Sequence, residues 1–145
     1  MQTPKLLAGT IAYTIGTFTL AVLWHVVLFK SSYDAFGYFE GEPSFALGLL
    51  TIFIQGLILS LLYQYFPFST EGLKGSMKFV FLIGIFFWTS HVLAFLAKQK
   101  ISMPWKFLGM ETFYLGIQFA VFGFILSFIF KSKSTGAEQG SGGNG

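Results

Sequence analysis

Four long apolar runs constrain this chain more than any other feature of its sequence. They cover residues 6–29, 45–66, 79–97 and 107–130, and Glu111 is the one charged residue inside any of them. An α-helix rises about 1.5 Å per residue, so roughly 20 residues cross a hydrocarbon layer of about 30 Å. Each run is about that long or longer. The sequence therefore predicts an all-α integral membrane protein with four transmembrane helices.

The scarcity of charge supports the same environment. Only 10% of the residues are charged and 54% are hydrophobic, whereas a soluble domain carries about a quarter charged residues. A membrane β-barrel alternates apolar and polar residues, but these runs are apolar at odd and even positions alike. The lipid bilayer is therefore the expected partner of the outer surface.

The links between the runs are short, at residues 30–44, 67–78 and 98–106. Short links join neighbouring antiparallel helices, so we expect an up-down-up-down bundle within residues 1–131. Residues 132–145 are rich in Gly and Ser and are expected to form a disordered tail.

The lysines suggest an orientation. The end with both termini carries Lys5, Lys74, Lys78, Lys131 and Lys133, and the opposite end carries Lys30, Lys98, Lys100 and Lys106. Because positive charge favours the cytoplasmic side, we expect both termini in the cytoplasm and the protein in a plasma or inner membrane. The lysines are scattered singly, so nucleic acid is not an expected partner.

The chain contains no cysteine. This excludes disulfides, thiolate metal sites, iron–sulfur clusters, covalently attached c-type haem and a cysteine nucleophile. No cofactor is predicted, although a b-type haem or a divalent metal held by imidazole and carboxylate groups stays open.

Glycines repeat at a spacing of seven in two of the runs. They are Gly9 and Gly16 in the first run and Gly109, Gly116 and Gly123 in the fourth. In lipid, small residues let helix backbones approach closely. We therefore expect these stripes to be packing seams, within the bundle or between copies.

The fourth run also has a polar stripe. At 100° per residue, Glu111, Tyr114 and Gln118 fall within about 60° of one another, on a different side from the glycines. Such side chains avoid lipid tails, so the stripe should face the bundle interior, a cavity or a partner. Gln55 and Gln118 both lie near mid-membrane, and we expect their carboxamides to hydrogen bond to each other.

Three titratable residues share one membrane level. His25, His91 and Glu111 lie near ends of three runs that meet on the same side of an alternating bundle, about 6–9 Å below its boundary. Ionisable residues at such depth are candidates for function. The leading interpretation is that each one hydrogen bonds locally or reaches water at the interface. The alternatives are that they bind a proton or small polar ligand, a b-type haem or a divalent metal.

Polar aromatic residues lie towards the run ends, where interfacial belts form: Trp24, Tyr33, Tyr38, Tyr65, Trp88 and Trp105. The first link, residues 31–43, mixes such rings with acids on the side of the titratable cluster. It is expected to anchor the hairpin at the interface, and the alternative is a lid over the cluster.

The glycine seams and the lack of a soluble domain favour a non-catalytic accessory or assembly subunit of a membrane complex, or a homo-oligomer. Its expected partners are other membrane subunits or itself. The alternative is a small-solute or proton-coupled transporter that uses the Glu/His cluster. A haem- or metal-binding membrane protein is the second alternative, and no enzymatic activity of its own is expected.

Overall fold

A computed structural model of the protein describes residues 2–38, 41–42 and 44–131. Within them the elements are helices only: α1 (Thr3–Ala21), η1 (Val22–Leu28), α2 (Lys30–Phe36), α3 (Phe45–Tyr65), α4 (Leu73–Phe87), η2 (Trp88–Leu93), α5 (Ala94–Lys98) and α6 (Pro104–Ile129). They form four helices long and apolar enough to cross a membrane. This confirms the predicted all-α four-helix membrane bundle. The predicted tail, 132–145, lies outside the described residues.

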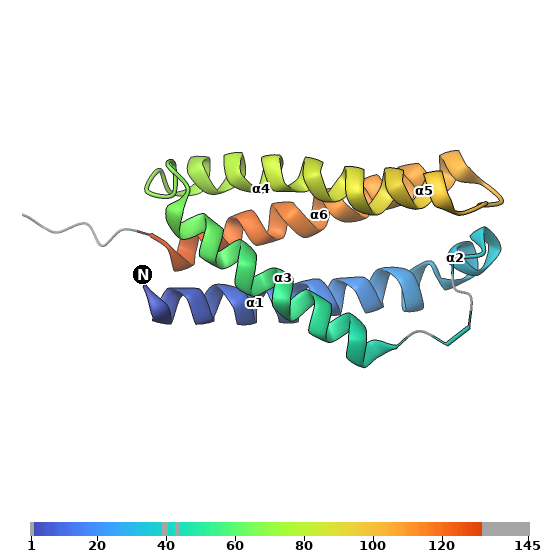
Figure 1. Ribbon diagram of the computed structural model, residues 1–145, viewed down its shortest axis with the longest axis horizontal. Coiled ribbons are helices and arrows are strands. Elements are labelled where there is room, and N and C mark those ends of the chain that lie inside the picture. Colours follow the sequence, from blue (N-terminus) through green and yellow to red (C-terminus); the bar gives the residue numbers. More distant parts are fainter. Residues whose placement is uncertain (1, 39–40, 43, 132–145) are drawn as a thin grey trace, which may run out of the picture.

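The four long helices alternate in direction, so both ends of the bundle's described chain lie together (Figure 1). The opposite end carries α2 and the link between α5 and α6, and we call it the α2 end. Helix α1 packs mainly on α3 and α6, and α4 packs mainly on α6. Helix α3 crosses α1 obliquely, so its N-terminal half diverges from α4 and α5 (Figure 1).

Helix α4 begins at Leu73, six residues before the apolar run that predicted it. Gly72 precedes it with φ of +60°, a left-handed conformation that glycine adopts without strain. The first turns are polar: Lys78 pairs with Glu71 at 2.9 Å and lies 3.9 Å from the centroid of the Phe68 ring. An apolar run marks the hydrocarbon layer, whereas a helix continues beyond it. The other seven helix ends lie within three residues of the predicted ones.

Two segments, η1 and η2, are π-helical. In η1 the bonds skip five residues, and the Phe29 amide donates to the Trp24 carbonyl at 3.0 Å. A π-helical segment rotates the side chains that follow relative to a regular α-helix, and such segments are common at functional sites. Each of the two carries one of the chain's two histidines, His25 in η1 and His91 in η2.

The first link contains the short helix α2, which ends at Gly37 with φ of +74°. Its residues Tyr33 and Phe36 are fully buried, and both rings contact the Phe107 ring of α6. The link therefore covers the α2 end of the bundle. The sequence predicted that this link anchors the hairpin at the interface, with a lid over the titratable cluster as the alternative. The packing of α2 matches the lid.

The glycines divide into two groups. A Cβ built on Gly9 would lie 2.5 Å from the Ser60 Oγ of α3, and one on Gly123 would lie 2.8 Å from Val80 of α4. No described atom outside the local helix lies within 4 Å of a Cβ built on Gly16, Gly109 or Gly116. Another close approach of α1 and α3 is at Gly56, whose Cβ would lie 3.0 Å from the Thr10 carbonyl oxygen.

Candidate functional site

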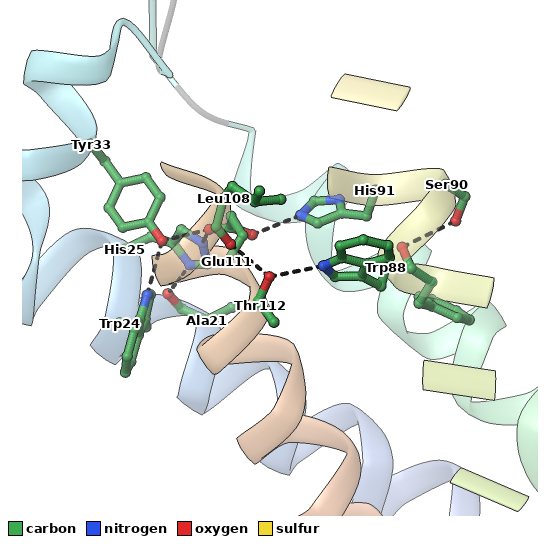
Figure 2. Close-up of polar contacts among 11 residues, drawn as sticks. Ala21, Trp24, His25, Tyr33, Trp88, Ser90, His91, Leu108, Glu111 and Thr112 are labelled. Atoms are coloured by element: carbon green, nitrogen blue, oxygen red, sulfur yellow. Dashed lines mark hydrogen bonds and ion pairs between the residues drawn. The ribbon is translucent and has the colours of Figure 1, made fainter. Parts of the chain in front are cut away.

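Glu111 is the centre of a buried polar cluster at the α2 end. Its side chain is fully buried on α6, and it hydrogen bonds to imidazoles on two other helices (Figure 2). His25 Nε2 lies 2.9 Å from Oε1, and His91 Nε2 lies 3.1 Å from Oε2. The three residues that share a membrane level are therefore in direct contact, with the carboxylate between the two rings.

A fourth group comes from the covering helix α2. The Tyr33 hydroxyl donates to Glu111 Oε1, and it accepts a hydrogen bond from Trp24 Nε1 at 2.9 Å (Figure 2). Burial, and then the Glu111 charge, raise the pKa of Tyr33. Its hydroxyl therefore keeps its proton and remains a donor to the carboxylate.

The hydrogen-bond partners assign the protons of His25. Its Nδ1 lies 3.0 Å from the Ala21 carbonyl oxygen, which can only accept, so Nδ1 carries a hydrogen. A neutral imidazole has one N–H, so Nε2 carries a second hydrogen only when the ring is cationic. The contact between Nε2 and Glu111 Oε1 then requires one proton, on the imidazole or on the carboxyl.

That shared proton has an electrostatic consequence. A cationic His25 beside a carboxylate, or a neutral His25 beside a carboxyl, both leave the pair with no net charge. A buried charge in lipid is costly unless it is paired and hydrogen-bonded. The pair therefore explains how a fully buried acid is accommodated within a membrane helix, and it makes the cluster a site that holds a proton.

His91 connects the cluster to its surroundings. Its side chain is 41% exposed, whereas the Glu111 side chain is not exposed at all. Its Nε2 faces the carboxylate and so carries a hydrogen, which leaves Nδ1 as the position for a further proton. The η2 segment is tied to α6 by Trp88, whose indole N–H donates to Thr112 Oγ1 at 2.8 Å (Figure 2).

A cavity of about 520 Å³ lies beside the cluster, between α1, α3, η2 and α6. Its wall includes both histidines and Tyr114 at one level, and Gln55 and Gln118 deeper in the bundle. The other lining residues are mostly apolar, at Phe18, Ala21, Val22, Val26, Phe45, Leu47, Gly48, Ile52, Phe87 and Leu115, with Thr17, Tyr38, Ser44 and Thr51 among them. All six candidate ligand residues of the sequence analysis therefore line the cavity or, in the case of Glu111, lie directly behind its wall.

The predicted hydrogen bond between the two mid-membrane glutamines, Gln55 and Gln118, is wrong: they do not bond to each other directly. Tyr13 of α1 lies between them: Gln118 Nε2 donates to the Tyr13 hydroxyl at 3.0 Å, and that hydroxyl donates to Gln55 Oε1 at 3.4 Å. The depths of the glutamines in their runs placed them at one level. Depth along the membrane does not determine how far apart two side chains lie across the bundle, and here Tyr13 lies between them.

The Nε2 atoms of both histidines are engaged by Glu111 in this arrangement. Each imidazole directs its Nε2 at a different oxygen of Glu111, so no single point is presented with both nitrogens. No group of three His, Asp or Glu side chains in the described residues is arranged to hold a metal ion. A haem iron would need both Nε2 atoms, which here already bond to the carboxylate.

Sequence reasoning overlooked three residues of these networks. Trp24 and Tyr33 were assigned to an interfacial belt, and Tyr13 was not singled out. The position of Trp24 next to His25 is a weak signal. Tyr33 and Tyr13 carried none, because only the fold brings α2 over α6 and α1 between the glutamines.

The cluster and the cavity are the features from which a function has to be inferred. No protein-family model, no curated protein and no solved structure matches this chain.

Proposed function

We propose that this small membrane protein is a proton-linked carrier of a small solute, with Glu111, His25 and His91 as its proton site. The observation that carries the proposal is the fully buried Glu111 carboxylate held between two imidazoles on the wall of a cavity. Intramembrane acids and histidines paired in this way are typical of proton relays in transporters.

The two histidines have different roles in this proposal. His25 shares a proton with Glu111 and keeps the resting cluster neutral. His91 borders the cavity and is half exposed, so its Nδ1 takes the second proton and gives the cavity wall a positive charge. A change of charge at the wall alters the affinity for a solute beside it, which couples proton binding to solute binding.

The test is proton binding by the whole protein in liposomes on a solid-supported membrane. An acid step should displace charge in the wild type, and Glu111→Gln should reduce that displacement, because His91 then loses the carboxylate that faces its Nε2. Glutamine keeps the size of the side chain and removes the group that shares the proton.

Glu71→Gln is the matched control. Glu71 is a partly exposed acid that pairs with Lys78, and it lies just before the first residue of α4, far along the bundle from the cluster. It should leave the displaced charge unchanged. His91→Gln is a second variant at a half-exposed position, and it should remove the second proton even if Glu111→Gln does not fold. A displacement equal to that of the wild type in both cluster variants would overturn the proposal.

A second candidate, an accessory subunit or homo-oligomer, is favoured by a different observation. Gly109 and Gly116 face a shallow groove on the outside of α6, bordered by Trp88, Trp105 and Phe113. Small residues at a helix surface allow close contact with another helix in lipid. The mass of the reconstituted protein measures this role, since a stable monomer that binds no other subunit would remove it.

A further inference from the structure

The Tyr114 hydroxyl is the most informative polar group of the cavity. Tyr114 is 5% exposed and lines the cavity, with its ring 4.7 Å from the His25 ring. Its hydroxyl makes no hydrogen bond to any described residue, in contrast to Tyr13 and Tyr33, whose hydroxyls both do. A hydroxyl that lines a cavity and has no partner among the described residues is free to bond to a group that enters the cavity.

The charges around the cavity narrow the class of that group. None of the described residues in its wall is Asp, Glu, Lys or Arg. Glu111 lies behind the wall and is already satisfied by His25, His91 and Tyr33. While His91 has not taken up the second proton, a ligand with a permanent charge would lose its hydration without gaining a counter-ion from the described residues of the wall, which is costly. An uncharged ligand pays no such penalty.

The apolar part of the wall further narrows the class of ligand that the cavity can bind. Aromatic and aliphatic side chains from α1, η1, α3, α4 and α6 make up much of the wall, and polar groups lie among them. Its volume of about 520 Å³ is within the range of about 300–1,000 Å³ typical of sites for small organic ligands. A wall of this kind fits a molecule with an apolar body and a hydrogen-bonding group on it.

The cavity is placed to receive such a molecule from the bilayer. Its rim on α3 includes Phe45 and Leu47, which are 50% and 62% exposed on a helix that spans the membrane. Because the N-terminal half of α3 diverges from α4 and α5 (Figure 1), this rim lies on the side that faces lipid. A molecule dissolved in the bilayer reaches it without crossing water.

We propose that the cavity binds an uncharged amphiphile from the bilayer, with its hydrogen-bonding group on the Tyr114 hydroxyl and its apolar body between α1 and α3. The inference rests on the proposed carrier function and names its substrate class. It assigns Tyr114 a binding role that is separate from the proton site.

Three probes with the same ring system and different charge test it: 1-naphthol, which is neutral at pH 7, 1-naphthoate and 1-naphthylmethylammonium. Each is titrated by calorimetry into the whole protein in nanodiscs, with empty nanodiscs to subtract partition into lipid. We expect saturable binding of 1-naphthol and at least about tenfold weaker binding of both charged probes. Equal binding of all three, or no saturable binding of 1-naphthol, would overturn the proposal.

Two variants locate the binding. Tyr114→Phe keeps the ring and removes the hydroxyl, so it should weaken 1-naphthol binding about three- to tenfold, the value of one hydrogen bond. Gly48→Leu adds a side chain into open space at the cavity wall and should also weaken it. Tyr65→Phe makes the same change at a residue that is 70% exposed and should have no effect.

Failure of this inference and failure of the carrier function give different results. Binding of 1-naphthol reports on the cavity, whereas the charge displaced by an acid step reports on Glu111 and the two histidines. Unaltered 1-naphthol binding in both cavity variants, together with a Glu111-dependent displacement, would reject the ligand class and keep the proton site. If an acid step displaces no charge in the wild type, the proposed carrier function is rejected.

Discussion

At the scale of single residues, the chemistry depends on one carboxylate and the donors around it. Glu111 hydrogen bonds to His25, His91 and Tyr33, and none of these partners is near it in the sequence. The carbonyl partner of His25 Nδ1 then leaves one proton between Nε2 and Oε1. A buried acid whose proton count is determined by its neighbours is suited to bind and release a proton.

Tyr33→Phe should destabilise the protein by about 1–3 kcal/mol, because it leaves Trp24 Nε1 without its acceptor and removes one of the two hydrogen bonds at Glu111 Oε1. The measurement is the free energy of unfolding in a titration of mixed micelles with a denaturing detergent. Tyr65→Phe is the control at an exposed tyrosine and should change it by less than about 0.5 kcal/mol. Equal stability of Tyr33→Phe and the wild type would show that α2 contributes little to holding the carboxylate.

At the scale of elements, α6 has three different faces. Its polar stripe, Glu111, Tyr114 and Gln118, is buried towards α1 and the cavity. Gly123 faces α4 at close distance, whereas Gly116 faces outwards with no described side chain over it. Glycines in the same seven-residue repeat therefore lie in two different environments. Positions seven residues apart on a straight helix are rotated by about 20° from each other, and α4 packs on α6 over only part of its length.

Gly123→Leu should destabilise the bundle by about 1–3 kcal/mol or more, because its side chain would overlap Val80 and Met77. Gly16→Leu is the matched control: both substitutions gain the same helix propensity, but Gly16 has open space beside it. Thermal unfolding of the two variants by circular dichroism in detergent measures the difference. Equal melting temperatures would contradict the packing role of Gly123.

At the scale of the whole molecule, two helix pairs are joined along one seam. Helices α1 and α3 form one pair and α4 and α6 the other, and α1 on α6 connects them. Because α3 diverges from α4 and α5 (Figure 1), the seam does not close on the far side, and the cavity occupies that space. The cluster at the α2 end lies where η1, α2, η2 and α6 meet.

If two copies associate through the outer groove of α6, Gly116→Leu should convert the dimer to a monomer without lowering the melting temperature. The substituted side chain meets no described atom within its own chain, so its effect falls on the partner. Native mass spectrometry from nanodiscs measures the copy number, and Gly16→Leu is the control on another helix. A dimer that persists in Gly116→Leu would place the interface elsewhere.

Much of the fold follows from the sequence, and less of the site does. The four spans could be predicted from the apolar runs, because burial of uncharged residues in lipid depends on length and composition. The common level of His25, His91 and Glu111 followed from counting residues to the run ends. The donors Tyr33 and Trp24 could not be predicted, since they depend on α2, which has no apolar run of its own.

The sequence by itself determined the solvent of this protein, its helix number and the depth of each polar residue, because lipid requires long uncharged helices and every residue adds a constant rise. The cytoplasmic position of the termini stays a prediction from its lysines. Only the tertiary structure decided which polar groups touch, which glycines pack and where a cavity remains. Those features depend on helix rotation and crossing, and the two π-helical segments and the oblique α3 alter both in ways that a regular helical period does not contain.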